Sequence, residues 1–451
     1  MKHTTPPALR PVPATEAPSP IRRDSVFRSA VRAARSSAWT AVAVLLLGLG
    51  FTQPGALQAQ DPLTEDVIQG GPKREGEPEL KDLPAEVKVN SAKVRPADKA
   101  GKPGHRYVRG IERVRKNTGR IDWSLQGDWI AFDAKGSDEL YDLYVGKADG
   151  SKERCLTCEN FDFRKVNVLN PVWHPSGNLL VVQVQENARK LKLNPAQLAT
   201  PFQGLHSDLW VISADGRFSF QITKIREQGG AVLDPFFSFE ADRLIWSERI
   251  TNKNEPWGDW GVRVVGFKYK RGVPRLGAIK TYPSGGWRGY RAASALAPND
   301  RSILVTASLP AASFEQGLDI FQVSLEDGTL EPLTQAPDLR DEKAQYSPKS
   351  DHIVWASNRG IDRPKSGAVP WRTDLWIMPA EVNPGLRRSQ ERLTYFNHPD
   401  ADEYLGEALI SDYAWSPAGD ELLLHVVYRR PGGEDVEEAL YKVSLAPSFR
   451  R

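Results

Sequence analysis

The chain has 451 residues, with 60 basic and 57 acidic side chains, a formal net charge of +3 and a pI near 8.6. Seven of the basic but only two of the acidic residues lie in the first sixty positions, so the rest of the chain has a net charge of −2. A near-neutral chain gives no electrostatic reason to expect nucleic acid or an anionic membrane surface as a partner.

Residues 1–60 have the pattern of a secretory signal peptide. Several arginines precede the apolar run Ala41 to Phe51, and small residues around Ala59 offer a cleavage site. The run is too short to span a bilayer, which takes about 20 residues. We therefore expect a periplasmic or secreted protein with no membrane span after cleavage.

Residues 61–106 are rich in proline, glutamate, lysine and glycine, and they have few large apolar side chains. Such a composition cannot bury a core, so we expect a flexible arm. The folded domain is expected over residues 107–451.

A short motif recurs six times in that domain: an aromatic residue, a turn of the type Ser-Pro-x-Gly, and an apolar run. Its clearest copy is Trp415 to Gly419, followed by Leu422 to Leu424. Proline presets the turn and glycine tolerates the positive φ at its exit, while an apolar run without alternation indicates a strand buried on both faces. The aromatic or equivalent apolar positions are Trp123, Trp173, Phe237, Leu296, Tyr346 and Trp415.

Two more strands follow most of these hairpins. The third begins with Asp-Leu-aromatic or a close variant and runs in several copies into an Asp-Gly turn, a strong hairpin signal. The fourth ends in Leu-Thr or Ile-Thr. Because the aspartates recur at one position of the repeat, we expect structural hydrogen bonds from them and not catalysis. They are Asp142, Asp208, Asp319 and Asp374.

The four-strand repeat resembles the TolB-type β-propeller repeat, and the resemblance extends from Tyr107 to Leu445. Single sheets that cannot bury their own faces, repeated at intervals of about 40–50 residues, are typical of a propeller. The resemblance implies an all-β fold: a six-bladed propeller of four-stranded antiparallel blades. It covers the propeller only, because residues 61–106 are too few to supply the extra N-terminal domain of TolB.

The last repeat has no fourth strand of its own after Leu440 to Val443. The segment Tyr107 to Val114 has the composition of a strand, and we expect it to complete the last blade and leave no open sheet edge. The alternative is that this segment continues the arm.

Cys155 and Cys158, in Cys-Leu-Thr-Cys, are the only cysteines. In an exported chain we expect a small structural disulfide, which requires a turn because a straight strand would hold the pair about 10 Å apart. Free thiols and a redox function stay open as alternatives. Two thiols do not make a zinc site and no histidine follows Cys158, so we expect no metal and no cofactor.

Positions near the start of the inner strands face the channel of a propeller, and here they include Asp234, Lys343 and Asp412. The oligogalacturonate lyases, which are propeller enzymes of this general type, hold a metal there through histidines, but no histidine cluster occurs at these positions. The Gly-x-Ser-x-Gly elbow of prolyl-peptidase-type hydrolases is also absent. We therefore expect no catalytic residues.

Arginine and aromatic side chains gather before the fourth repeat, and such residues are the usual anchors of binding patches. The alternative is that the aromatic side chains cap the core of a blade. The candidate partner-binding residues are Trp257, Trp260, Trp287, Arg288, Tyr290 and Arg291.

The sequence thus favours a monomeric, exported, non-catalytic binding or scaffold module of the cell envelope, which presents rim loops to a protein or glycan partner. The alternative is a polysaccharide-acting enzyme, lyase-like or hydrolase-like, with a site in the central channel. A ligand-sensing subunit of a larger assembly is the third possibility.

Overall fold

The computed structural model describes residues 104–186, 204–225, 230–251, 258–270, 272–287, 291–308, 317–336, 339–361, 372–381 and 389–446. For residues 283–287, 291 and 308 only the backbone is described. The expected signal peptide, 1–60, lies outside the described residues, as does the expected arm, 61–106, apart from its last three residues. Within the described ranges, no helix is both long enough and apolar enough to cross a membrane.

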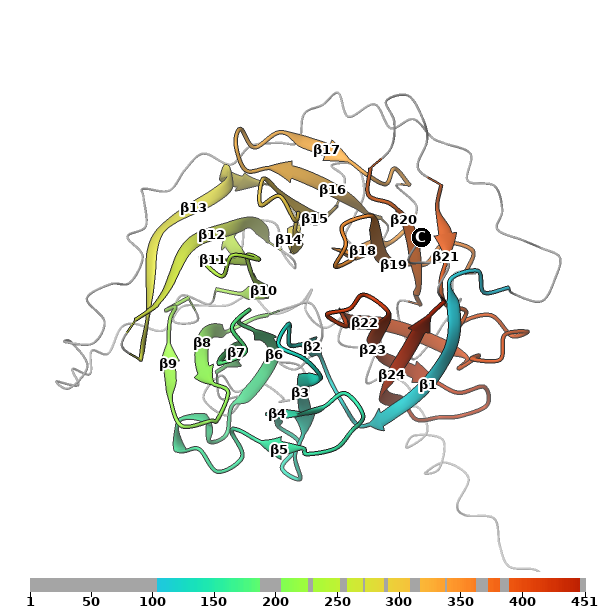
Figure 1. Ribbon diagram of the computed structural model, residues 1–451, viewed down its shortest axis with the longest axis horizontal. Helices are drawn as coiled ribbons and strands as arrows, with labels where there is room; N and C mark the ends of the chain where they lie inside the picture. The colour runs from blue at the N-terminus through green and yellow to red at the C-terminus, as the bar shows by residue number, and fades with distance from the viewer. Residues whose placement is uncertain are drawn as a thin grey trace, which may run out of the picture. The chain divides into compact units, whose positions relative to one another are not determined.

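The domain is an all-β propeller of six four-stranded antiparallel sheets, which confirms the expected fold class (Figure 1). Blade 1 consists of β2 (Ile121–Trp123), β3 (Trp129–Lys135), β4 (Tyr141–Lys147) and β5 (Arg154–Cys155). Blade 2 consists of β6 (Asn167–Trp173), β7 (Leu179–Gln185), β8 (Ser207–Ser213) and β9 (Ser219–Gln221). Blade 3 consists of β10 (Val232–Phe237), β11 (Arg243–Thr251), β12 (Asp259–Lys270) and β13 (Val273–Trp287).

The remaining three blades repeat the plan. Blade 4 consists of β14 (Arg291–Leu296), β15 (Ser302–Ser308), β16 (Leu318–Ser324) and β17 (Leu330–Pro332). Blade 5 consists of β18 (Asp341–Tyr346), β19 (His352–Ser357), β20 (Asp374–Pro379) and β21 (Glu391–Arg392). Blade 6 consists of β22 (Glu407–Trp415), β23 (Glu421–Arg429), β24 (Glu437–Leu445) and β1 (Val108–Lys116). A single turn of 3₁₀ helix, η2 (Phe161–Phe163), lies between blades 1 and 2.

The ring closes because the first strand of the domain pairs with the last. β1 runs antiparallel to β24, with Ile111 opposite Val443 and Lys116 opposite Ala439. The main-chain N–H of Ala446 also donates to the carbonyl oxygen of Tyr107, at an N···O distance of 2.7 Å. The expected closure of the last blade by the segment after residue 107 is therefore confirmed, and blade 6 has no unpaired edge at β24.

Each blade is too thin to bury its own faces, so the core is divided among the contacts between blades. In β7, Leu180 and Val182 pack towards blade 1, whereas Leu179 and Val181 pack towards blade 3. The same alternation gives an apolar cluster between every pair of neighbouring blades, including the pair of blades 6 and 1. The uninterrupted apolar runs of the sequence follow from this burial on both faces.

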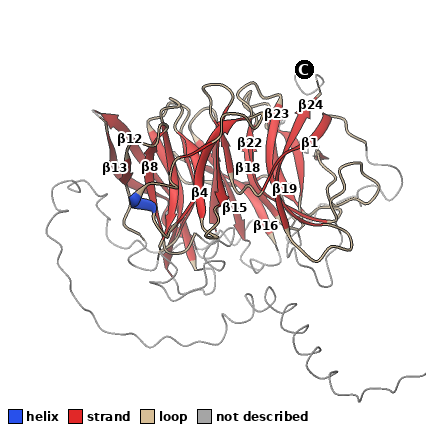
Figure 2. Cartoon of the chain, turned by 90° about the horizontal axis from the view of Figure 1, so that it is seen from below, coloured by secondary structure: helices blue, strands red, loops and turns tan. Residues whose placement is uncertain are grey.

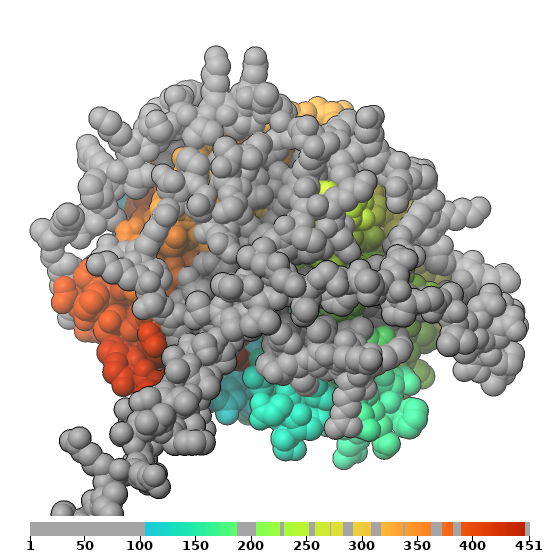
Figure 3. Space-filling view, turned by 180° about the vertical axis from the view of Figure 1, so that it is seen from behind, coloured from blue at the N-terminus to red at the C-terminus, as the bar shows by residue number. Residues whose placement is uncertain are grey.

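Because neighbouring strands of a blade are antiparallel, successive connections lie alternately on one face of the propeller and on the other (Figure 2). Turns from the first to the second strand of each blade lie on one face, which we call the turn face. The strand ends from which the second strand leads to the third, and one blade to the next, lie on the other face, and much of the chain that joins them is outside the described residues. Figure 3 views the ring from behind Figure 1, with the first two blades in cyan and green at the lower edge.

The recurring aspartates hold the outer strands of four blades in place. In blade 4, Asp319 Oδ1 accepts hydrogen bonds from the Thr334 hydroxyl and from the main-chain N–H of Ala336, both at 2.9 Å, and Thr334 Oγ1 in turn accepts from the N–H of Ile320. The aspartate–threonine bond recurs in blades 1, 2 and 5. This bond explains both the aspartate and the Leu-Thr ending of the repeat, and we call it the Asp–Thr latch.

Candidate functional site

The inner strands of the blades are irregular at one position, three residues before the aromatic of the repeat. The antiparallel register between the first and second strands shifts at this point in β6, β10 and β18. Asn170, Asp234 and Lys343 have φ values of 52°, 47° and 56° there, which is the left-handed region. A bulge of this kind redirects a side chain, here towards the channel.

Main-chain hydrogen bonds from the neighbouring blade support these bulges. The N–H of Asn170 donates to Asp133 Oδ2 at 2.7 Å, and the N–H of Lys343 donates to Thr306 Oγ1 at 3.0 Å. Asp133 and Thr306 both lie on the second strand of the preceding blade. The backbone of the channel wall is thus held at these bulges by side chains of the preceding blade.

Taken around the ring, the six positions form what we call the channel ring. Three of its members, Asp234, Lys343 and Asp412, were expected to face the channel, and the structure brings them together. The channel ring consists of Arg120, Asn170, Asp234, Ala293, Lys343 and Asp412, and Ala293 is its exception, because it packs in the apolar cluster between blades 3 and 4.

The charged members of the channel ring are paired with one another. Arg120 Nη1 lies 2.8 Å from Asp234 Oδ1, and Lys343 Nζ lies 3.1 Å from the same oxygen. Lys343 Nζ is also 3.9 Å from Asp412 Oδ1. Two cations and two carboxylates therefore neutralise each other, and their side chains are only 9–14% exposed.

The pairing fixes the charge of Asp234. Its burial alone would raise the pKa, but the charges of Lys343 and Arg120 outweigh burial and hold the pKa of Asp234 below its usual value. Asp234 therefore stays ionised at neutral pH, and it is a poor proton donor.

A cavity of about 240 Å³ lies on the turn-face side of the channel ring. Its polar lining includes four members of the channel ring, Asn170, Asp234, Lys343 and Asp412. Its apolar lining includes aromatic residues of the inner strands, among them Trp173. The cavity is of the size that admits a side chain or a small polar group.

Apolar residues occupy the turn position two residues after the aromatic of each repeat, and four of them, Leu125, Pro175, Phe239 and Pro348, line the cavity. Leu125 and Phe239 are the exposed members that line the cavity, and 46% and 47% of their surfaces are accessible. The other blades carry proline at this position. We call the set the apolar rim: Leu125, Pro175, Phe239, Pro298, Pro348 and Pro417.

Asp122 adds a carboxyl to the cavity lining beside Asp412. Asp122 Oδ2 accepts a hydrogen bond from the main-chain N–H of Trp173 at 2.6 Å. Burial raises the pKa of Asp122 to about 7, and the neighbouring charge of Asp412 adds to the rise. Near neutral pH this carboxyl therefore exchanges a proton readily.

The serines of the cavity lining are engaged in turns and in contacts with the main chain. Ser238 Oγ and Ser416 Oγ each donate to the aspartate four residues on, at 2.9 Å. Ser294 Oγ donates to the carbonyl of Ala344 at 2.7 Å. These hydroxyls hold the first turn of their repeats or link neighbouring blades.

The expected aromatic and arginine patch is largely beyond the described part of the chain. Trp257, Arg288 and Tyr290 lie outside the described residues, and for Trp287 and Arg291 only the backbone is described. Trp260 is described, is only 2% exposed, and packs in an apolar cluster with Leu233 and Leu318 among others. Its indole therefore contributes to the core of blades 3 and 4.

Cys155 and Cys158 form a disulfide at the end of β5, with an S–S distance of 1.99 Å and a Cα–Cα distance of 5.8 Å. The chain turns directly after β5, which provides the bend that the pairing needs. The disulfide lies on the outer strand of blade 1, and neither cysteine lines the cavity.

Arg120 and Asn170 belong to the channel ring but were not anticipated from the sequence. Both lie three residues before the aromatic of their repeats, at Trp123 and Trp173, as Asp234, Lys343 and Asp412 do in theirs. Their constant distance from the aromatic residue of the repeat is the sequence signal that could have identified Arg120 and Asn170.

In overall structure the chain is similar to TolB-like β-propellers, at low sequence identity. TolB from Acinetobacter baumannii is 13% identical, with a TM-score of 0.40, and the match covers 62% of this chain and 55% of that one. The chain thus spans about half the length of that TolB. A candidate TolB from Agrobacterium tumefaciens is 15% identical, with a TM-score of 0.43, over 74% of this chain and 91% of that chain.

An oligogalacturonate lyase from Vibrio parahaemolyticus is 12% identical, with a TM-score of 0.41, over 74% of this chain and 79% of the lyase. These likenesses concern the fold alone. No protein-family model and no curated protein matches the sequence.

Proposed function

We propose that this protein is an exported, non-catalytic binding propeller of the cell envelope, and that its turn face receives a segment of a partner protein. The observation that carries the proposal is an apolar rim above a polar floor that is already neutral. Leu125 and Phe239 are exposed at the mouth of a cavity, and exposed apolar side chains beside a concave site are typical of docking surfaces.

The charge pairing of the floor supports binding over catalysis. Asp234 is held ionised by Arg120 and Lys343, so it is not free to act as an acid. A ligand that enters the cavity meets paired donors and acceptors, which fix its orientation at little cost in desolvation of unpaired charge.

The chemistry of the rim favours a protein partner over a glycan. Sugar rings usually stack on wide, exposed indole faces, whereas the tryptophans of the cavity lining, Trp123, Trp173 and Trp415, are only 6–8% exposed, and the exposed aromatic of the lining is a single phenylalanine, Phe239. The accessible surface at the mouth consists of leucine, phenylalanine and prolines, which suits the apolar centre of a protein interface.

The test is capture of a partner from envelope extract by the immobilised chain. Leu125→Asp combined with Phe239→Asp places charge on the rim without touching the channel ring, and we expect it to reduce capture of any specific partner at least about tenfold. Phe161→Ser is the matched control, because Phe161 is a 75% exposed aromatic in η2 that does not line the cavity. Equal capture by the rim variant and the control would remove the turn face from the proposal.

A polysaccharide-acting enzyme is the second candidate, and Asp122 is the observation that favours it. A carboxyl with a pKa of about 7 beside a second carboxyl, Asp412, is the kind of pair that general acid–base cleavage of a glycosidic bond needs. Incubation of the chain with acidic and neutral polysaccharides tests this candidate. Turnover that Asp122→Asn abolishes would replace the binding proposal with an enzymatic one.

The patch of Trp287 and Arg291 stays a proposal for a second contact, on the face opposite to the turn face. The backbone places the end of β13 and the start of β14 next to the connection between blades 3 and 4. Trp287→Ala and Arg291→Ala in the same capture experiment test it separately from the rim.

A further inference from the structure

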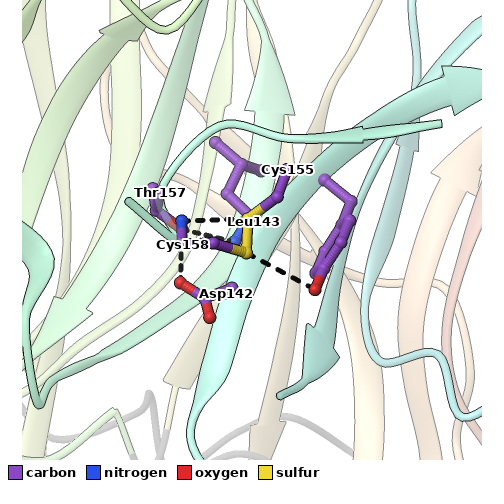
Figure 4. The surroundings of a disulfide bond; sticks show 6 residues. Asp142, Leu143, Cys155, Thr157 and Cys158 are labelled. Atoms are coloured by element: carbon purple, nitrogen blue, oxygen red, sulfur yellow. Dashed lines mark hydrogen bonds between the residues drawn. A yellow bond between two sulfur atoms is a disulfide. The ribbon is translucent and has the colours of Figure 1, made fainter. Parts of the chain in front are cut away.

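The Cys155–Cys158 disulfide lies at an accessible site on the outer strand of blade 1 (Figure 4). Cys158 is exposed and Cys155 is half-buried. Each sulfur has one hydrogen-bond donor beside it: the main-chain N–H of Cys158 lies 2.9 Å from Cys155 Sγ, and the Tyr144 hydroxyl oxygen lies 3.5 Å from Cys158 Sγ. Donors in these positions stabilise a thiolate on either sulfur.

Asp142 brings a carboxylate to the same place. One of its oxygens lies within 4.8 Å of both sulfur atoms, and Figure 4 shows the side chain beside Cys158. This separation is short enough for proton transfer through one water molecule. The site therefore combines an open disulfide, two thiolate-stabilising donors and a group that can carry a proton.

Asp142 departs from its counterparts in the repeat. In blades 2, 4 and 5 the latch aspartate is at most 1% exposed. Its Oδ1 also accepts a main-chain N–H two residues beyond the threonine, at 2.6 to 2.9 Å. Asp142 is only half-buried, and within the described part of the chain it accepts a hydrogen bond from the Thr157 hydroxyl, at 2.7 Å, without the second one from the main chain. Blade 1, which carries both cysteines of the chain, is thus the blade whose latch carboxylate is partly exposed to solvent.

We propose that Cys155 and Cys158 form a thiol–disulfide exchange site that oxidises a dithiol, with Asp142 as the proton carrier. The substrate class is a pair of thiols on a peptide or on a small molecule, and the exposed Cys158 sulfur is the point of attack.

The exchange takes two steps. The first substrate thiol loses its proton to solvent, its thiolate attacks Cys158 Sγ, the Cys155–Cys158 bond breaks, and Cys155 leaves as a thiolate that takes the proton of the Asp142 carboxyl. Asp142 then takes the proton of the second substrate thiol, whose sulfur attacks the mixed disulfide and releases Cys158 as a thiolate, which is protonated from solvent. Two electrons and two protons pass from the substrate to this chain, and the substrate is left with a disulfide.

The surroundings of Asp142 suit this role. Burial raises the pKa of its carboxyl above the usual value, against the hydrogen bond from Thr157, and the nearby Asp138 adds to the rise. Tyr144 is the other titratable group at the disulfide, and the Arg115–Glu153 ion pair lies next to Tyr144. A protonated fraction of Asp142 therefore persists to higher pH than for a free aspartate.

The test is the rate at which dithiothreitol reduces the disulfide in the folded full-length chain, followed by alkylation of new thiols and mass measurement. Asp142→Asn keeps an oxygen for the Thr157 hydroxyl but cannot give up a proton. We expect it to slow reduction about tenfold at pH 6, with a smaller difference at higher pH, where the wild-type carboxyl is also deprotonated. Asp208→Asn is the matched control, since it changes the same latch position in blade 2, which has no cysteine. We expect it to react at the wild-type rate.

A second variant keeps the proposal testable if Asp142→Asn does not fold. Tyr144→Phe removes the donor beside Cys158, and with glutathione we expect the mixed disulfide at Cys158 to persist at least about threefold longer. Equal rates for wild type, Asp142→Asn and Tyr144→Phe would overturn the proposal. Reduction that occurs only in denaturant would overturn it as well, since it would show a purely structural disulfide.

The source of the thiols is decided by comparing two probes at equal thiol concentration. Faster reduction by a synthetic peptide with two cysteines than by dithiothreitol points to a protein substrate, and the reverse order points to a small dithiol. Reduction of the folded chain by neither probe would overturn the exchange site.

Discussion

Arg120 on blade 1 and Asp234 on blade 3 are 114 residues apart in sequence, yet Arg120 Nη1 lies 2.8 Å from Asp234 Oδ1. Blade 2 stands between these two blades in the ring, so the contact joins sheets that are not neighbours. Lys343 of blade 5 reaches the same oxygen from the other side of the channel, at 3.1 Å. One carboxylate thus ties together three blades that do not adjoin each other.

This arrangement predicts that Asp234 and Arg120 are energetically coupled. Asp234→Asn removes the charged oxygen that Arg120 and Lys343 share, and we expect a loss of about 2 kcal/mol in the free energy of unfolding. The loss is below the ~3–5 kcal/mol of a fully buried broken pair because the cavity admits water. Urea unfolding of Asp234→Asn, Arg120→Gln and the double variant measures the coupling, and strictly additive losses would contradict it.

The Asp–Thr latch predicts a large effect from removal of one hydroxyl. Thr334→Val keeps the shape of the side chain but removes the hydroxyl that donates to the buried Asp319 and accepts from the N–H of Ile320, so Asp319 retains the N–H of Ala336 alone of its two described donors. We expect the free energy of unfolding to fall by about 2–3 kcal/mol, since a hydrogen bond to a buried charge is lost. Thr334→Ser retains the hydroxyl and is the control. Denaturant unfolding checks both, and a loss in Thr334→Val no larger than that in Thr334→Ser would contradict a special contribution of the hydroxyl.

Closure by β1 predicts that loss of residues 104–116 matters more than loss of the 103 residues before them. Removal of residues 1–103 leaves β1 intact, and we expect a thermal unfolding midpoint close to that of the full chain. Removal of residues 1–116 also deletes β1 and exposes the edge of β24, and we expect a clearly lower midpoint and concentration-dependent association. Calorimetry and light scattering of the two truncated chains make the comparison. Similar midpoints would mean that the ring holds without its closing strand.

The fold could be predicted from the sequence because its signals are local. A Ser-Pro-x-Gly turn and an Asp-Gly turn each specify a hairpin within a few residues, as at Trp415 to Gly419, and six copies in order leave few other architectures. The structural role of the repeated aspartates could be predicted for the same reason, because a residue that recurs at one position in four blades is expected to stabilise the blade itself.

The site was less predictable because its contacts are formed across the ring. Nothing near Arg120 in the sequence indicates that its partner is Asp234, two blades away. Asp142 is the same kind of case: its sequence matches that of the other latches, and only the neighbouring main chain shows that it lacks their second hydrogen bond. Trp260 was expected in a surface patch, but β12 starts at Asp259 and carries the indole into the core.

Asp133 predicts a pH dependence of stability that originates at the channel wall. Its carboxylate accepts the main-chain N–H of Arg120 and of Asn170, at 2.9 and 2.7 Å, but the side chain is 1% exposed, and burial raises its pKa to about 7. Because the pKa in the folded state is above that of the unfolded chain, the contribution of Asp133 to stability is fully present below about pH 4. It is lost as the pH rises through about 7.

We therefore expect the free energy of unfolding of the wild type to decline relative to that of Asp133→Asn as the pH rises from about 4 to 7. The largest slope is about 1.4 kcal/mol per pH unit, because the unfolded chain binds less than one proton at this site in that window and the folded chain binds up to one. Urea unfolding of both chains at half-unit pH steps gives the difference directly. His425, whose charge lowers the pKa of Asp133, is the neighbour most able to shift the window. A constant difference across this range would show that Asp133 is already ionised in the folded chain at pH 4.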